Sequence, residues 1–183
     1  MSGVLGRSSN YGDRPLPRQT FRSAADAALE EEVAIYLESQ WHYTYAKLGK
    51  DDPNRQKSRI DGLFHCDGTV MNFVEIKGCG RRFDDPFLER NGWLTAEKKV
   101  FAARTLYEIV RLPILIIVHF QCGTIAHLNA ASPYTRIASG GRTDRDSPGD
   151  LEPMACFNLG DMVVVRAARA DQKENYLENE RDP

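Results

Sequence analysis

Three charged residues interrupt two runs of sequence that otherwise suit buried strands. Glu75 and Lys77 alternate with Val74 and Ile76, so in a strand the two charged side chains point to one face and the aliphatic ones to the other. Asp61 occupies the preceding run. Two neighbouring carboxylates repel each other and are best tolerated around a hard divalent cation. Such an ion polarises a phosphodiester and lowers the pKa of a bound water, while a lysine stabilises developing negative charge. These residue types therefore indicate phosphodiester hydrolysis.

Whether Asp61 joins this pair depends on how the two strands align across the turn at residues 66–68 (Cys-Asp-Gly). A two-residue loop would turn Asp61 to the face opposite that of Glu75. A three-residue loop with a left-handed glycine would place Asp61 opposite Phe73 and on the face of Glu75. A β-bulge in either strand would also bring the two carboxylates to one face. We therefore expect a hairpin with an odd loop or a bulge.

Asp61, followed after a hairpin by the Glu-Ile-Lys tripeptide 75–77, resembles the core of the PD-(D/E)xK nuclease superfamily. The resemblance covers residues 23–129 and departs from the name-giving pattern at Ile60, where the superfamily pattern has proline. It implies an α/β fold with a central mixed β-sheet flanked by helices. The expected restriction-endonuclease-like core has the order helix, strand, strand, helix, strand, strand.

A helix is predicted over residues 23–40, where apolar residues recur at helical spacing. At about 100° per residue, Glu32 falls within the apolar stripe, whereas Glu30 and Glu31 fall outside it. A carboxylate inside an apolar stripe is costly unless it is paired or bound to a metal. The resemblance implies an acidic residue of the first helix at the metal site, and Glu32 matches by its face. The alternative is that Glu32 lies at the edge of the stripe and reaches solvent.

A second helix is predicted over residues 93–111, and Lys98 projects from the middle of its apolar stripe, which consists of Leu94, Phe101, Ala102, Leu106 and Ile109. The resemblance implies a basic residue of this helix at the active site, although a lysine there can also extend outward to solvent. The apolar run 112–120 predicts a buried strand that returns parallel to the hairpin. Another strand is expected over 124–129, and a terminal hairpin over 153–158 and 162–167.

The resemblance also implies a cofactor, Mg²⁺, for which Mn²⁺ can substitute. Its ligands would be three carboxylates and one backbone carbonyl, those of Asp61, Glu75, Glu32 and Ile76. Lys77 would position the attacking water, and Lys98 would be a second catalytic lysine. Arg81 and Arg82 follow the metal site in the chain and would bind the phosphate of the substrate.

The whole chain has the composition of one globular domain rather than of a membrane protein or a disulfide scaffold. Its 183 residues can bury a substantial core, and its four cysteines form no C-x-x-C pair, which argues against a disulfide framework or a zinc site. We expect a flexible basic arm over 1–22, a single domain over 23–169 and an acidic polar tail over 170–183. No apolar run is long enough to span a membrane, so a cytoplasmic location is expected. The net charge of −2 neither supports nor opposes binding to nucleic acid.

The expected function is metal-dependent hydrolysis of DNA. Because the sequence reveals no separate recognition domain, the expected action is structure-selective or non-specific. The alternative is a catalytically inactive nucleic-acid-binding or accessory module that keeps the fold. The sequence leaves undecided whether the chain binds either of two protein partners: a second copy of itself in a homodimer, or a protein that docks on the acidic tail.

Overall fold

A computed structural model describes residues 24–48, 60–141 and 151–168, so the predicted arm and the predicted tail lie outside the described residues. The elements in chain order are α1 (Ala24–Trp41), β1 (Thr44–Lys47), β2 (Gly62–Cys66), β3 (Thr69–Cys79), α2 (Pro86–Asn91), β4 (Trp93–Ala96), α3 (Glu97–Val110), β5 (Ile114–Phe120), β6 (Ile125–Asn129), β7 (Arg136–Gly141), β8 (Leu151–Phe157), the 3₁₀ turn η1 (Leu159–Asp161) and β9 (Val163–Arg166). No helix within the described ranges is long and apolar enough to cross a membrane.

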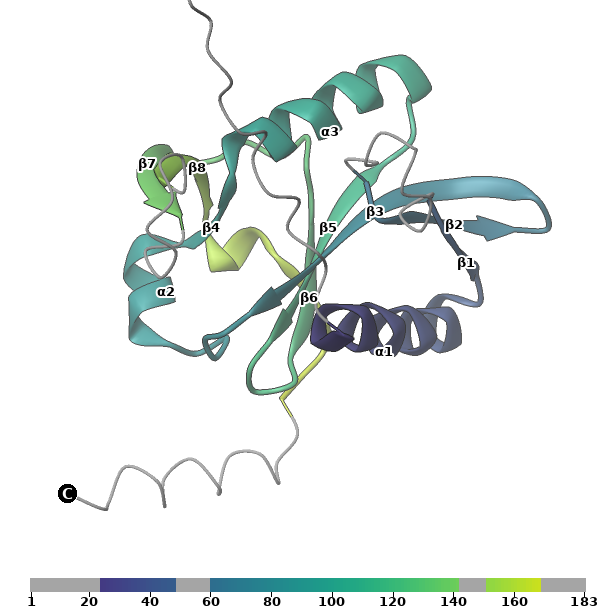
Figure 1. Ribbon diagram of the computed structural model, residues 1–183, viewed down its shortest axis with the longest axis horizontal. Helices are drawn as coiled ribbons and strands as arrows, with labels where there is room; N and C mark the ends of the chain where they lie inside the picture. Colours follow the sequence, from purple (N-terminus) through teal and green to yellow (C-terminus); the bar gives the residue numbers. More distant parts are fainter. Residues whose placement is uncertain (1–23, 49–59, 142–150, 169–183) are drawn as a thin grey trace, which may run out of the picture.

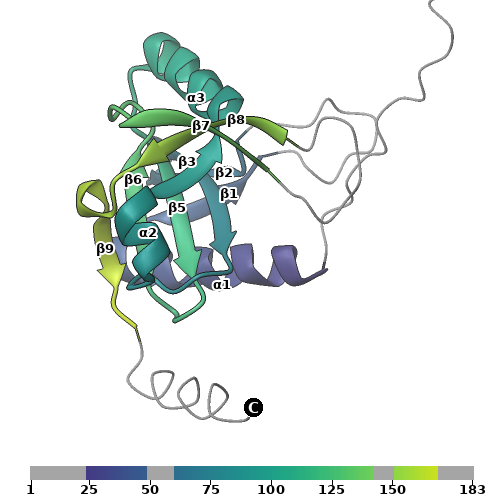
Figure 2. The same cartoon turned by 90° about the vertical axis from the view of Figure 1, so that its left-hand side faces the viewer.

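A six-stranded sheet with the order β1-β2-β3-β5-β6-β9 forms the centre of the molecule. Its strands pair antiparallel except β3 and β5, which are parallel. Helices α1 and α3 lie on opposite sides of this sheet (Figures 1 and 2). The expectation of an α/β fold with a central mixed sheet flanked by helices is therefore confirmed. The expected element order was incomplete, because β1 precedes the hairpin and because α2 and β4 come between β3 and α3.

The hairpin of β2 and β3 contains both a tight turn and a bulge. Asp67 and Gly68 form a two-residue turn with φ angles of 48° and 80°, the left-handed values that such a turn requires. The register then shifts by one residue between Phe64 and His65. Gly62 consequently pairs with Val74. Of the two expected alternatives, an odd loop or a bulge, the bulge is thus the one present. It brings Asp61 beside Glu75 rather than opposite Phe73, the position that a three-residue loop would have given.

One face of the six-stranded sheet is covered by α1. Val33 and Leu37 of the helix are fully buried against Val74 and Ile76 of β3 and against Ile117 of β5. These strand residues alternate with Glu75 and Lys77, whose side chains therefore point to the opposite face.

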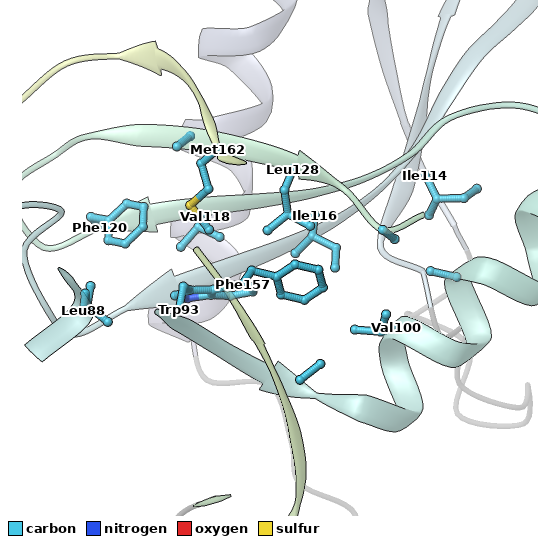
Figure 3. Packing of buried hydrophobic residues seen from close by; sticks show 14 of the residues in the cluster. Leu88, Trp93, Val100, Ile114, Ile116, Val118, Phe120, Leu128, Phe157 and Met162 are labelled. Atoms are coloured by element: carbon cyan, nitrogen blue, oxygen red, sulfur yellow. The ribbon is translucent and has the colours of Figure 1, made fainter. Parts of the chain in front are cut away.

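That opposite face is covered by α3 and by a second sheet with the order β4-β8-β7. Figure 3 shows Phe157 and Trp93 packed below Ile116 and Val118 of β5. The parallel register places Glu75 beside Ile116 and Lys77 beside Val118. The charged pair thus occupies the side of the sheet that α3 approaches, and α3 can contribute side chains to it.

Two other sequence predictions are corrected here. The predicted helix 93–111 begins only at Glu97, because its first four residues form β4 and pair with β8. The predicted terminal hairpin is wrong, because β8 pairs with β4 and β7 while β9 pairs with β6. The strand over 112–120 does return parallel to β3, as expected.

Candidate active site

Asp61, directly before β2, and Glu75 of β3 are almost entirely buried, with 2% and 5% of their surface exposed. The Asp61 carboxylate is held in place by the backbone of β3, since the Ile76 amide donates a hydrogen bond to its Oδ2 at 2.7 Å. The Asp61 amide in turn donates to the Val74 carbonyl at 3.0 Å. The bulged register therefore turns both carboxylates toward the same side of the sheet.

Two lysines bind one oxygen of Glu75. Lys77 Nζ lies 2.5 Å from Glu75 Oε1 and 4.0 Å from Asp61 Oδ2, and it also donates to the Ile76 carbonyl at 3.3 Å. Lys99 Nζ, from the first turn of α3, donates to the same Oε1 of Glu75. The two positive charges compensate the two buried carboxylates, which would otherwise be costly to remove from water.

The other oxygen of Glu75, Oε2, is buried and has no hydrogen-bond partner. Buried polar atoms are nearly always paired, so an unpaired carboxylate oxygen marks a position where a ligand can bind. Burial by itself raises the pKa of Glu75, but the charges of Lys77 and Lys99 outweigh this effect and hold the pKa below its ordinary value of 4.5. Glu75 is thus an anion at neutral pH and can accept a cation at Oε2.

Lys99 is the lysine of α3 that contacts Glu75, whereas Lys98, which the sequence placed on the inner face of this helix, lies on its outer face. Lys98 points outward, with 71% of its side chain exposed, and its Nζ lies 2.5 Å from Glu152 Oε2. The predicted stripe was rotated from the real one, because Val100 and Ala103 are buried whereas Phe101 is 70% exposed. Lys99 precedes Ala103 by one helical turn and therefore shares its buried face.

The pKa of Lys99 lies below its ordinary value of 10.5. Burial lowers it most and repulsion from Lys77 lowers it further, although the attraction of Glu75 acts in the opposite direction. Two ammonium groups that share one carboxylate oxygen compete for it. A negatively charged substrate group that drew one of the two ammonium groups away from Glu75 would therefore relieve the repulsion between Lys77 and Lys99.

Glu30 is the buried acid of α1, and the prediction of Glu32 is not supported by its position. Glu30 is 3% exposed and belongs to the buried stripe with Val33 and Leu37. The side chain of Glu32 is 53% exposed, and its Oε1 accepts a hydrogen bond from Arg166 at 3.1 Å. The helix is rotated relative to the predicted stripe. The spacing of Glu30, Val33 and Leu37 (i, i+3, i+7) was the signal for this face.

Glu30 approaches the hairpin through Tyr45 of β1. The Tyr45 hydroxyl donates to Glu30 Oε1 at 2.8 Å, and the Tyr45 ring packs directly on Gly62, which follows Asp61. Glu30 of α1 therefore holds the Tyr45 ring against the backbone next to Asp61. Within the described ranges, no three His, Cys, Asp or Glu side chains are close enough to hold a metal ion together.

The predicted phosphate-binding arginines follow β3 and are engaged with acids of the same loop. Arg81 pairs with Asp85 at 3.0 Å and Arg82 with Asp84 at 2.9 Å. The Arg81 guanidinium also lies 4.3 Å from the centre of the Phe87 ring. Arg81 and Arg82 thus lie two and three residues beyond Cys79, where β3 ends, and each forms an ion pair with an acid of the loop that follows.

The donor set fits a magnesium ion that keeps several waters. Mg²⁺ is commonly bound by one or two carboxylates together with water and substrate phosphate. Asp61 and Glu75 supply two carboxylates, and Glu75 Oε2 is unpartnered. Ile76, which follows Glu75 in the chain and whose amide binds Asp61, supplies a backbone carbonyl. The expected set of three carboxylates is reduced to two, since Glu32 is directed to Arg166.

A mixed sheet flanked by helices, with a buried aspartate on one hairpin strand and Glu-x-Lys on the next, is the arrangement that defines the PD-(D/E)xK nuclease superfamily. The family model described as phage putative PDDEXK endonuclease matches residues 16–165, and the chain belongs to this family. The comparisons with curated proteins and with solved structures found no match. The resemblance seen in Asp61 and the tripeptide 75–77 is thereby confirmed, and membership of this family suggests a nuclease.

Proposed function

We propose that this nuclease hydrolyses DNA with the help of a divalent metal ion, Mg²⁺ or Mn²⁺ in its place, bound between Asp61 and Glu75. The observation that carries the proposal is the burial of two adjacent carboxylates whose one unpartnered oxygen, Glu75 Oε2, faces no hydrogen-bond donor. The Ile76 carbonyl would complete the protein ligands. Most of the ion's ligands would then be water and phosphate oxygens, so the ion could coordinate the substrate phosphate directly.

A divalent ion in this position would polarise the phosphodiester and lower the pKa of a nearby water. The protein's own contribution is to hold the acids in place. The Ile76 amide orients Asp61 through the 2.7 Å hydrogen bond, and the lysines keep Glu75 ionised. Orientation of this kind reduces the rearrangement needed during the reaction.

Lys77 and Lys99 would act on the substrate once the cation takes over part of the charge of Glu75. Lys77 lies within 4.0 Å of both carboxylates, so its ammonium group can orient a water or stabilise negative charge on the phosphate. Lys99 approaches the same oxygen from α3. We assign it the second catalytic position that the sequence had given to Lys98.

Arg81 and Arg82 are proposed to bind a phosphate of the substrate next to the site. Arginine presents several donors in a fixed plane and can bind phosphate with two hydrogen bonds. Each arginine would exchange its ion pair with Asp85 or Asp84 for that contact. Because those carboxylates are solvent-accessible, the exchange costs little.

The test is cleavage of a panel of labelled DNA substrates: duplex, single strand, flap and four-way junction. Wild-type protein is compared with Glu75→Ala and Lys77→Ala in Mg²⁺, in Mn²⁺ and in EDTA. We expect cleavage only with metal, and loss of at least about a hundredfold in rate for either variant. The preferred substrate distinguishes structure-selective from non-specific action.

Glu89→Ala, which removes an exposed glutamate of α2, is the matched control and is expected to cleave as the wild type does. Metal-independent cleavage, or full activity of Lys77→Ala, would contradict the mechanism. Binding of DNA without cleavage by folded wild-type protein would instead favour the non-catalytic module.

A further inference from the structure

A pocket of about 270 Å³ lies on the face of the six-stranded sheet opposite that of Glu75. It is lined by Trp41, Tyr43, Asn72, Leu115 and His127. Helix α1 ends at Trp41, which forms part of the pocket lining. Asn72 pairs with Phe64, which is buried under α1, so Asn72 faces the same side of the sheet. The pocket is therefore separated from the candidate active site by the sheet itself.

Two polar atoms at this pocket have no hydrogen-bond partner, the side-chain oxygen Oδ1 of Asn72 and the ring nitrogen Nδ1 of His127. Asn72 is only 8% exposed, so water outside the molecule cannot easily satisfy its amide. Buried polar atoms are nearly always paired in folded proteins. The Asn72 oxygen can only accept, so a ligand that pairs with it must carry a hydrogen-bond donor, while His127 Nδ1 accepts or donates according to its tautomer.

Aromatic rings frame the same pocket. The Trp41 ring stands edge-on to His127, with centroids 5.8 Å apart and an interplanar angle of 85°, and it packs in a similar way on Phe64 at 5.2 Å. These contacts hold the indole in place while part of it stays accessible. Tyr43 adds a second ring at the pocket wall. Aromatic walls with a polar floor favour a flat ligand that can stack and form hydrogen bonds at its edge.

The size of the pocket suits one small ring system, and its open side leaves room for the rest of a larger ligand. Its volume corresponds to several water molecules, at about 30 Å³ each. It lies just below the range of roughly 300–1,000 Å³ found for sites that take drug-sized molecules. An asparagine amide offers one donor and one acceptor in a plane, and this pair matches the edge of a nucleobase, adenine best of all.

We propose that this pocket binds a single nucleobase, held by Asn72 and His127 at its edge and by Trp41 at its face. The base can belong to a free nucleotide or to an unpaired position of a strand, since the recognising chemistry is the same. The site is distinct from the metal site. It requires neither Asp61 nor Glu75, and it does not depend on the proposed cleavage.

The test is a ¹H–¹⁵N NMR titration of the full chain in EDTA, where no divalent metal supports cleavage. The chain has two tryptophans, and Trp93, 5% exposed and in the core on the other side of the sheet, serves as an internal reference. The probes are adenosine monophosphate, ribose 5-phosphate, a short oligo(dA) and the same oligonucleotide with an abasic position. We expect adenosine monophosphate or the oligo(dA) to shift the Trp41 indole signal and to leave that of Trp93 in place.

Binding is expected to weaken about tenfold in Asn72→Leu and in His127→Phe, each of which removes one polar atom and keeps a similar volume. The spectra of the free variants show whether each is folded, and the two substitutions are independent of one another. A shift with the mononucleotide identifies a free-nucleotide site, and a shift with the oligonucleotide alone identifies a strand site. Equal shifts with ribose 5-phosphate, unchanged binding in both folded variants, or no shift of Trp41 with any probe at millimolar concentration would overturn the proposal.

Discussion

In the candidate site, Oε1 of Glu75 contacts both Lys77 and Lys99, while Oε2 has no hydrogen-bond partner. This asymmetry separates two tasks within a single carboxylate. The contact with Lys77 and Lys99 keeps Glu75 ionised despite its burial, while Oε2 stays available to a cation. A glutamine would keep the shape of the side chain but lose both the ion pairs and the charge.

The adjacent lysines Lys98 and Lys99 offer a direct test of which residue of α3 serves the site. Lys99→Met is expected to lower the cleavage rate about a hundredfold, because it removes a cation beside Glu75 and keeps the length of the side chain. Lys98→Met should stay within about threefold of the wild type, since it breaks only an exposed pair with Glu152. Rates are measured at saturating metal on the preferred substrate. The reverse order of the two effects would return the role to Lys98.

His127 predicts a specific pH dependence of stability. Burial lowers the pKa of His127 below its ordinary value of 6.5, so the unfolded chain binds a proton at a pH where the folded chain does not. The contribution of neutral His127 to the free energy of unfolding is then fully present above about pH 6.5, the ordinary pKa of histidine. This contribution is lost as the pH falls toward the lower pKa of the folded state. We expect the urea midpoint of the wild type to fall on acidification through this window.

The variant His127→Phe should lose part of that fall in the midpoint, and comparison of urea midpoints at pH 7.5 and 5 measures it. The remainder is expected to persist, because burial also lowers the pKa of His119. An identical pH dependence in the variant and the wild type would mean that His127 is not the group responsible.

Among the elements, the β2–β3 hairpin and β1 determine where Asp61 lies. The bulge aligns Asp61 with Glu75, and the ring of Tyr45 packs against the backbone at Gly62, next in the chain. A Cβ atom at Gly62 would lie 2.3 Å from Tyr45 Cε2, well inside van der Waals contact. Since the Tyr45 hydroxyl donates a hydrogen bond to Glu30, the ring cannot move away without breaking this partly buried bond.

Gly62→Ala is therefore expected to destabilise the protein by about 2 kcal/mol and to lower cleavage through displacement of Asp61. Gly80→Ala is the matched control, because nothing lies within 4 Å of the Cβ that it would add. Its effect on stability should stay below about 0.5 kcal/mol. Urea denaturation and the cleavage assay measure the two effects. A neutral Gly62→Ala would show that the tyrosine ring yields freely and does not hold the strand in place.

At the scale of the whole molecule, the parts of the site that were predicted from the sequence are those set by local chain geometry. Alternation along β3 sets Glu75 and Lys77 on one face, and the turn residues Asp67 and Gly68 mark the hairpin. The need for an odd loop or a bulge followed from counting residues across the hairpin. Each of these features depends on neighbours in sequence, so no knowledge of tertiary packing was required.

The contributions of the helices could not be predicted in the same way, because they depend on how each helix is rotated about its axis. Several apolar stripes were compatible with α3, and packing selected the one with Val100 and Ala103 over the one with Phe101. A rotation of this kind exchanges Lys98 for Lys99. In α1 it exchanges Glu32 for Glu30, although hydrophobicity alone would not bury a glutamate.

Metal binding should also be visible in the stability of the molecule as a whole. A ligand that binds only the folded state stabilises it by about 2.7 kcal/mol at a hundred times its Kd. In a domain of this size that gain raises Tm by roughly 5–10 °C. We expect Mg²⁺ or Mn²⁺ to produce such a rise in the wild type, measured by differential scanning fluorimetry against EDTA.

The rise in Tm should be absent from Asp61→Asn, which removes the charge but keeps an oxygen that can accept the hydrogen bond of the Ile76 amide. Asp161→Asn, at an exposed position of η1, should keep it. The comparison separates a metal bound between the two buried carboxylates from ions attracted to the acidic surface, which both variants would affect equally. An undiminished rise in Asp61→Asn would place the stabilising ion elsewhere and would remove the main physical support for Asp61 as a metal ligand.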